Sequence, residues 1–221
     1  MPTLPTDLVN STRSISTSTL ALPPLSALIL AGGEGRRMGG RDKGLVVYQQ
    51  QPLIQWVLDA LPEQVVQRVI SCNRNQDIYS QYGQTITDDP RFASADQPFA
   101  GAMVGIVAGL EMCTQDWVIV TPCDLIYYPR DFAAQAWAAL TQHLALHPQA
   151  AKIAVAHDGE RRQNLCLLLH RDEAIGIASA MTTSHAVHAW LDARDALSIP
   201  WPEPRAFTNV NDLATLAHLS P

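Results

Sequence analysis

From residue 26 onward, short apolar runs alternate with longer stretches of helical periodicity, and few folds accommodate that alternation. The first run, residues 26–31 (SALILA), is followed by glycines, as is typical of a strand buried on both faces. Similar runs occupy residues 68–72, 84–87, 117–124, 152–156 and 165–169, and helical patterns occupy residues 52–61, 101–112, 131–146, 172–181, 185–191 and 212–219. We therefore predict an α/β domain whose largely parallel sheet carries helices on both faces.

The first 25 residues differ in composition from this body. They are rich in Ser, Thr and Pro, and their only charged side chains are Asp7 and Arg13. They lack the basic start and the apolar stretch of a secretory signal, so we predict that residues 1–25 form a disordered extension. Residues 26–221 show no internal repeat and no second compositional block, which predicts a single domain.

The charge balance and the cysteines exclude several classes of protein. Lys and Arg total 15 against 21 Asp and Glu, so the surface lacks the basic field that general nucleic-acid binding needs. No apolar run approaches the roughly 20 residues of a membrane-spanning helix. The cysteines form no C-x-x-C pair and no zinc-finger spacing, which predicts free, buried thiols in a reducing cytoplasm; they are Cys72, Cys113, Cys123 and Cys166.

The segment LAGGEGRRMGGRDKGL, residues 30–45, follows the first predicted strand and holds five glycines before Lys43. Glycine lets the backbone approach a ligand closely, and successive free N–H groups can surround phosphate oxygens. Arg36, Arg37 and Lys43 add positive charge beyond the carboxyl end of the strand, where such folds bind their ligands. The segment therefore predicts a phosphate-binding site.

Two better-known phosphate motifs do not match this segment. A P-loop requires Ser or Thr after its lysine, whereas Gly44 follows Lys43. The dinucleotide fingerprint requires an acidic residue about 20 positions further on, at the end of a second strand. Ser71 and Cys72 stand at that place, so neither a Walker-type ATPase nor a dinucleotide-binding enzyme is indicated.

Acidic residues follow two of the predicted strands. Asp124 ends the run 117–124, and it is a candidate metal ligand because Mg²⁺ takes one or two carboxylates and completes its shell with water and substrate phosphates. Asp88 and Asp89 follow the run 84–87, and they either face the same crevice or form a surface Asx turn. Residues 157–163 (HDGERRQ) favour a hairpin loop, and residues 209–212 favour a helix N-cap.

Together these segments resemble the molybdenum cofactor guanylyltransferase family. The family's opening signature, L-A-G-G-x-x-x-R-M-G-G-x-D-K-G-L, matches residues 30–45 throughout. Further matches follow in order at residues 101–110 (GAMVGIVAGL), 122–124 (PCD), 157–161 (HDGER) and 209–211 (NVN). One departure is Ser71, which replaces an Asn that is frequent near the family's guanine site. The resemblance implies a three-layer α/β sandwich with a mostly parallel, Rossmann-like sheet.

The resemblance also implies an activity and a set of site residues. The family transfers GMP from GTP to the phosphate of molybdenum-bound molybdopterin, which yields the guanine dinucleotide and pyrophosphate. By this resemblance, the GTP-binding residues would be Leu30, Ala31, Gly32, Gly33, Lys43, Asp89 and Asp124, and Asp124 would hold Mg²⁺. Lys43, Arg37 and Asp124 would neutralise charge during catalysis. The pterin side would include Arg161, Asn209 and Asn211.

Two other functions stay open on the sequence alone. One is a nucleotidyltransferase with another acceptor, of the cytidylyl or sugar-phosphate type, and the other is a GTP-binding carrier without turnover. The metal position at Asp124 argues against a carrier. We expect a cytoplasmic enzyme whose partners are GTP, molybdenum-bound molybdopterin, and molybdoenzyme chaperones or other cofactor-biosynthesis proteins, and not nucleic acid or membrane.

Overall fold

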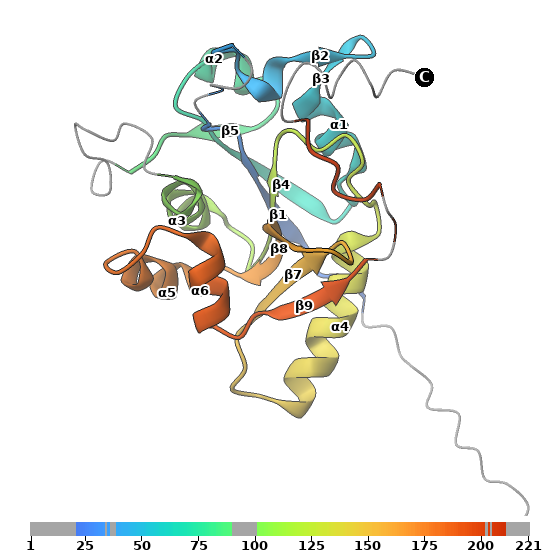
Figure 1. Ribbon diagram of the computed structural model, residues 1–221, viewed down its shortest axis with the longest axis vertical. Coiled ribbons are helices and arrows are strands. Elements are labelled where there is room, and N and C mark those ends of the chain that lie inside the picture. The colour runs from blue at the N-terminus through green and yellow to red at the C-terminus, as the bar shows by residue number, and fades with distance from the viewer. Residues whose placement is uncertain are drawn as a thin grey trace, which may run out of the picture.

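The computed structural model describes residues 21–33, 35, 39–89, 101–201, 203 and 205–210. Its centre is a seven-stranded sheet in the order β5-β4-β1-β6-β8-β7-β9 (Figure 1). The strands are β1 (Leu25–Leu30), β4 (Val65–Ser71), β5 (Gln84–Ile86), β6 (Trp117–Pro122), β7 (Ile153–His157), β8 (Arg162–His170) and β9 (Leu197–Pro200). Strand β8 is antiparallel to both β6 and β7, and the other pairings in this sheet are parallel. The predicted, mostly parallel sheet is confirmed.

Helices cover both faces of the sheet, as Figure 1 shows. They are α1 (Leu53–Ala60), α2 (Gln76–Tyr79), α3 (Ala102–Met112), α4 (Phe132–Leu146), α5 (Glu173–Ala180) and α6 (Val187–Ala193). Leu28 of β1 packs in one apolar cluster with α3, α5 and α6, whereas its neighbours Ala27 and Ile29 pack in another cluster with α1. Helix α4 packs on the same side as α1, through Phe132. Side chains therefore leave β1 alternately for two buried layers, and the expected three-layer sandwich is confirmed.

The first strand begins one residue earlier than predicted. Leu25 is fully buried, and its backbone N–H donates to the carbonyl of Gln64 at 2.8 Å. Leu22 also packs against the buried cluster on the α4 side of the sheet. The boundary predicted between residues 25 and 26 is therefore wrong for Leu25, because burial of that side chain requires it to belong to the domain. Residues 1–20 and the helix predicted at 212–219 lie outside the described residues.

Helix α3 lies close to the sheet because two of its residues are glycines. A Cβ atom on Gly109 would lie 2.3 Å from Leu28 Cδ1, and one on Gly105 would lie 2.5 Å from Ser71 Oγ. Both distances are far below van der Waals contact, so a side chain at either position would push the helix away from β1 and β4. The close packing brings the start of α3 to the carboxyl end of β4.

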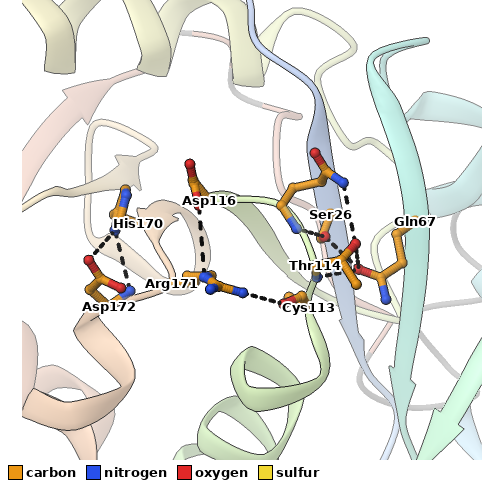
Figure 2. A network of polar contacts seen from close by, with 9 residues as sticks. Ser26, Gln67, Cys113, Thr114, Asp116, His170, Arg171 and Asp172 are labelled. Atoms are coloured by element: carbon orange, nitrogen blue, oxygen red, sulfur yellow. Dashed lines mark hydrogen bonds and ion pairs between the residues drawn. The ribbon is translucent and has the colours of Figure 1, made fainter.

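A polar network fixes the other end of α3 (Figure 2). Gln67 Oε1 on β4 accepts hydrogen bonds from Ser26 Oγ at 2.7 Å and from the Thr114 backbone N–H at 2.7 Å. Arg171 donates to the carbonyl of Cys113 at 3.2 Å and forms an ion pair with Asp116 at 3.8 Å. These contacts hold the α3–β6 connection at the amino ends of the strands, so α3 is tied to the sheet at both of its ends.

Several short elements lack a sequence signal. They are a 3₁₀ turn, η2 (Lys43–Leu45), a two-stranded sheet of β2 (Val47–Tyr48) and β3 (Gln51–Pro52), helix α2 and strand β9. Elements of two to four residues are too short for a periodicity to emerge. In the part of the chain that the structure describes, no helix has the length and apolar character to cross a membrane.

Candidate functional site

A cavity of about 270 Å³ lies at the carboxyl ends of β1, β4 and β6. The described residues that line it are Leu30, Ala31, Gly32, Gly33, Gly35, Lys43, Ser71, Asp88, Gly101, Ala102, Gly105, Pro122, Cys123, Asp124 and Leu165. Ligands of open parallel sheets bind at this edge, because the connections after the strands diverge there. The structure thus brings together residues 30–33, Lys43 and Asp124, which the sequence analysis assigned to the nucleotide.

Lys43 and Asp124 form an ion pair inside this cavity. Lys43 Nζ lies 2.9 Å from Asp124 Oδ2, although the two residues are 81 positions apart in the chain. Lys43 comes from η2, and Asp124 follows the buried strand β6 and is only 7% exposed. The carboxylate therefore holds the ammonium group at the carboxyl end of the sheet, next to the glycine backbone.

Arg74 holds the described part of the glycine loop, residues 30–45, in place. Its guanidinium group donates to three loop carbonyls, those of Gly40 at 2.9 Å, Arg41 at 3.1 Å and Gly33 at 3.3 Å. It also forms an ion pair with Asp42 at 3.4 Å. A planar group with five N–H donors can satisfy several carbonyls at once, which an ammonium group on a flexible stem cannot do in the same geometry. Arg74 therefore joins the two ends of the loop.

Asp42 is the second anchor of this loop. It is 8% exposed and accepts hydrogen bonds from the Tyr79 hydroxyl and from Asn75 Nδ2, the latter at 2.9 Å. Burial raises the pKa of Tyr79 above its usual range, and the nearby Cys123 and Asp42 shift it in the same direction. Tyr79 therefore stays protonated and remains a donor. These contacts therefore also fix the position of Lys43, the next residue after Asp42.

A second acidic residue lines the opposite part of the cavity. The carboxylate of Asp88 accepts a hydrogen bond from Asn73 Nδ2 at 2.7 Å, and its backbone N–H donates to Asn73 Oδ1 at 2.9 Å. Burial raises the pKa of Asp88, and the hydrogen bond from Asn73 partly offsets that increase. Of the two adjacent aspartates, the structure places Asp88 in the cavity lining, whereas the sequence analysis assigned Asp89 to the nucleotide. The role of Asp89 stays a prediction.

The four cysteines are free and buried, as predicted. Cys123 lines the cavity, and burial raises its pKa well above the usual value, with Asp124 and Asp42 acting in the same direction. Burial also raises the pKa of Cys72 to about 11. Because a thiolate and not a thiol is the nucleophile, the Cys123 side chain serves as part of the cavity wall rather than as an attacking group.

Of the residues expected on the pterin side, the structure describes Asn209 and Arg161, and it places them in different segments of the fold. Asn209 forms a β-bridge with Leu125, and Val210 N–H donates to the carbonyl of Asp124 at 3.0 Å. Asn209 Oδ1 is buried and has no hydrogen-bond partner among the described residues, and it lies next to the loop that holds Asp124. Arg161 has a side chain that is 72% exposed and is not among the described residues lining the cavity. Arg37, its neighbour Arg36, and Asn211 lie outside the described residues.

The sequence analysis did not identify the residues that hold the loop. Asp42 lies within the opening signature, and Asn73, Arg74 and Asn75 directly follow Cys72. An Asn-Arg-Asn run after a buried strand is a usable signal, because polar side chains there face the same sheet edge as the ligand. The loop partners of Arg74 and Asn75 are more than 30 residues away in the chain, and the partner of Asn73, Asp88, is 15 residues away, so the pairing itself could not be read from spacing.

One carboxylate in the cavity suits a hard divalent cation. In the part of the chain that the structure describes, no three His, Cys, Asp or Glu residues are grouped to hold a metal. Mg²⁺ does not need such a group, since one or two carboxylates suffice when water and substrate phosphates complete its shell. Asp124, nearly buried and facing the cavity beside Lys43, fits that pattern.

The chain is similar in sequence to known nucleotidyltransferases. Residues 27–197 match the family described as MobA-like NTP transferase domain. A relative from Shewanella frigidimarina, named molybdenum cofactor guanylyltransferase, is 37% identical over 191 residues, which cover 86% of this chain and 92% of the relative. A relative of the same name from Pasteurella multocida is 34% identical over 194 residues, which cover 86% of this chain and 96% of that protein.

Solved structures show the same fold at lower identity. The molybdopterin-guanine dinucleotide biosynthesis protein A of Archaeoglobus fulgidus matches with a TM-score of 0.63 and 18% identity, covering 87% of this chain and 95% of that one. A Mycobacterium tuberculosis protein solved in complex with manganese matches with a TM-score of 0.55 and 11% identity, covering 89% of this chain and 100% of that one. The Rossmann-like arrangement expected from the sequence is thereby confirmed.

Proposed function

Because this chain belongs to the molybdenum cofactor guanylyltransferase family, we propose that it transfers GMP from GTP to the phosphate of molybdenum-bound molybdopterin. The observation that supports this proposal best is the cavity at the carboxyl edge of the sheet. Ala31, Gly32 and Gly33 line it, together with the Lys43–Asp124 ion pair. Backbone N–H groups, a lysine and a carboxylate are the groups that bind a triphosphate together with its metal ion.

The reaction needs placement and charge neutralisation more than it needs a general base. An oxygen of the acceptor phosphate forms a bond to the α-phosphorus of GTP, the bond from that phosphorus to the bridging oxygen breaks, and pyrophosphate leaves. The acceptor oxygen is already anionic at neutral pH, so no proton has to be removed from it. Repulsion between the two anions and the charge on pyrophosphate are the obstacles that a positively charged site reduces.

Lys43 is the described residue best placed for that task. Its ammonium group faces the cavity and is balanced by Asp124. When a triphosphate enters, Lys43 can donate to its oxygens while the loop N–H groups bind the others. Arg37, which we place in the same role by resemblance, would add a further cation. The contacts of Arg74 and Asp42 hold the described part of the loop, so Lys43 is in position before substrate binds.

Nucleotidyltransferases of this kind use a divalent metal, and we expect Mg²⁺ here. Asp124 would hold the ion, which would neutralise phosphate charge and orient the triphosphate when bound. A metal on Asp124 would also replace the positive charge that Lys43 supplies to that carboxylate, so Lys43 would become available to the phosphates. On substrate binding, Lys43 would thus exchange its ion pair with Asp124 for contacts with the substrate phosphates.

We infer that the acceptor approaches from the side of Asn209. This residue lies on the strand-like segment that pairs with Leu125, directly after Asp124. Its buried side-chain oxygen, Oδ1, has no hydrogen-bond partner among the described residues and can accept a hydrogen bond from a pterin N–H group. Asn211 and Arg161 stay predictions for the same side.

A pyrophosphate-release assay tests the proposal. The protein, GTP and Mg²⁺ are mixed with molybdenum-bound molybdopterin, with a sugar 1-phosphate, or with no acceptor, and the first two mixtures are repeated with CTP. We expect release with GTP and the pterin only. Release with CTP or with the sugar phosphate would identify another nucleotidyltransferase. Stoichiometric GTP binding without release in any mixture would identify a carrier and contradict the proposal.

A further inference from the structure

Two histidines lie one helical turn apart at the carboxyl end of α4. His143 is in the last turn of the helix, and His147 is its C-cap residue. Their imidazole rings are 4.8 Å apart between centroids and are tilted by 42°. Residues four apart on a helix share one face, and H-x-x-x-H is the spacing with which metalloprotease helices bind zinc. Leu144 stands where such proteases have their catalytic glutamate, so the pair indicates a metal site without that hydrolytic chemistry.

The separation of the two rings fits a shared metal ion. An imidazole nitrogen binds a divalent transition metal at about 2.0–2.1 Å, which places the ion about 3.2 Å from the centre of that ring. Two rings bound to one ion would therefore have centres about 4.5 Å apart at a right angle and about 5.2 Å apart at the tetrahedral angle. The observed 4.8 Å lies between these two values. Simple ring contacts also occur at this separation, so the surroundings of the pair decide what it can bind.

The surroundings of the histidine pair favour a cation over an anion. A groove of about 580 Å³ is lined by both histidines and by Asp195, which belongs to the connection between α6 and β9. The carboxyl end of α4 adds the partial negative charge of its last carbonyl groups. Neither ring forms a hydrogen bond or an ion pair with another residue that the structure describes, so the ring nitrogens are available. The groove also has room for the water molecules that complete the shell of an ion held by two side chains.

We propose that His143 and His147 bind a divalent transition-metal ion such as Zn²⁺, Ni²⁺ or Cu²⁺. Imidazole nitrogens suit these ions, whereas Mg²⁺ takes oxygen ligands. Since no three candidate ligands are grouped within the described ranges, two protein nitrogens and water would form the shell. Asp195, in the same groove, would accept hydrogen bonds from a bound water molecule and so orient it.

This site is separate from the catalytic cavity. The cavity lies at the carboxyl ends of β1, β4 and β6, whereas α4 leads into the amino end of β7, which runs in the same direction as β1. The two sites are therefore at opposite edges of the sheet, and a six-residue strand such as β1 separates these edges by about 20 Å. Figure 1 shows the end of α4 at the bottom of the view, whereas β2, which follows the Lys43 turn, is at the top.

Titration calorimetry with Zn²⁺ and, separately, with Ni²⁺ tests this site. Excess Mg²⁺ is present throughout, so that it competes for the carboxylate of Asp124. We expect the wild type to bind one equivalent of metal, and His143→Ala and His147→Ala each to bind it at least tenfold more weakly; tenfold corresponds to about 1.4 kcal/mol. Asp195→Asn should weaken binding by a smaller factor, because this side chain would contact the ion only through water.

A matched control and a spectroscopic measurement locate the metal. His188→Ala makes the same chemical change at an exposed position of α6, and it should keep Zn²⁺ affinity within twofold. Paramagnetic Co²⁺ should broaden the imidazole proton signals of His143 and His147 before those of the other histidines. Guanylyl transfer with Mg²⁺ should be unchanged in His143→Ala and His147→Ala, which would show that both variants are folded.

Two outcomes would overturn this inference. If the variant that combines His143→Ala with His147→Ala binds Zn²⁺ and Ni²⁺ as tightly as the wild type does, the two rings form an aromatic contact only. If His188→Ala loses as much affinity as the α4 variants do, the metal binds elsewhere. Neither outcome bears on the proposed guanylyl transfer, because that activity is measured separately and depends on the opposite edge of the sheet.

Discussion

The glycine loop of residues 30–45 and the turn of residues 157–161 are both polar, and both contain glycine and arginine, but they are held in opposite ways. The described part of the loop is fixed from a distance, by Arg74 and Asn75 some 33 to 41 positions along the chain. The turn is fixed locally, because Asp158 Oδ1 accepts from the backbone N–H groups of Glu160 at 2.9 Å and Arg161 at 2.8 Å. The comparison shows that a motif's polar composition does not reveal whether it forms a ligand site.

A similar contrast separates Asp88, which lines the cavity together with part of the glycine loop, from Asp158 in the turn. Burial raises the pKa of Asp88, which lines the cavity. Burial alone would also raise the pKa of Asp158, but the backbone N–H groups of Arg161 and Glu160 and the amide of Gln163 outweigh it and lower that pKa. Ionised Asp158 therefore stabilises the fold. Ionised Asp88, in contrast, has too few hydrogen-bond donors to offset its burial.

Loss of the cavity's lysine should have the largest effect. We expect Lys43→Ala to lower kcat for guanylyl transfer at least a hundredfold, because the positive charge acts on phosphates during the reaction. The ion pair with Asp124 is partly exposed, so the melting temperature should change by only a few degrees. Steady-state kinetics and thermal unfolding measure both effects. Turnover within twofold of wild type would remove Lys43 from the catalytic machinery.

Asp124→Asn should separate metal dependence from nucleotide binding. The amide keeps the shape of the side chain but loses the negative charge that a hard cation prefers. We expect the Mg²⁺ concentration needed for half-maximal transfer to rise at least tenfold, with a smaller loss of metal-free GTP affinity. A titration of activity with Mg²⁺, repeated with Mn²⁺, measures this change. An unchanged metal titration would mean that Asp124 serves only to hold Lys43.

Substitutions at two arginines test the comparison between the loop and the turn. Arg74→Ala should lower kcat/KM for GTP ten- to a hundredfold, because a small displacement of positioned groups has effects of that size. Arg74→Lys should restore little, since a single ammonium group cannot bond to three carbonyls in the same plane. Arg161→Ala should keep GTP affinity within twofold, and any effect should be confined to KM for the pterin acceptor. Equal losses of GTP affinity in both alanine variants would contradict the comparison.

Two aspartate substitutions should differ in their effect on the melting temperature. These effects are the smallest that we expect. Asp158→Asn should lower the melting temperature at pH 7 by about 2–4 °C, equivalent to roughly 1 kcal/mol. Since the folded pKa of Asp158 is lowered, its contribution is present above the unfolded pKa of about 3.9 and is lost as pH falls through the folded pKa. The difference from wild type should therefore shrink in acid. Asp88→Asn should leave the melting temperature at pH 7 unchanged or slightly higher, because the ionised carboxylate has a raised pKa.

Melting curves at several pH values between 3 and 8 record both effects. If Asp88→Asn lowers the melting temperature as much as Asp158→Asn does, the two carboxylates contribute equally to the stability of the fold.

The sequence predicted the layers of the fold and the cavity edge, because continuous apolar runs and the glycine signature are local features. It did not predict that Leu25 belongs to β1, since the Ser, Thr and Pro content of the preceding residues masked one buried side chain. It assigned Asp89 and not Asp88 to the nucleotide, because the contact that holds Asp88 in the cavity lining comes from Asn73, 15 positions earlier in the chain. The positions of Arg74 and Asp42 follow from pairing across the fold, which no local pattern encodes.

A crystal structure of the protein with Mg²⁺ and a non-reactive GTP analogue would test the central claim most directly. We predict that the triphosphate lies on the glycine loop beside Lys43 and Asp124. The open groove lined by Tyr127, Trp201 and Arg205 is another concave surface in the described structure, and it should stay free of nucleotide. A triphosphate bound in that groove, with an empty cavity at the carboxyl ends of β1, β4 and β6, would contradict the account.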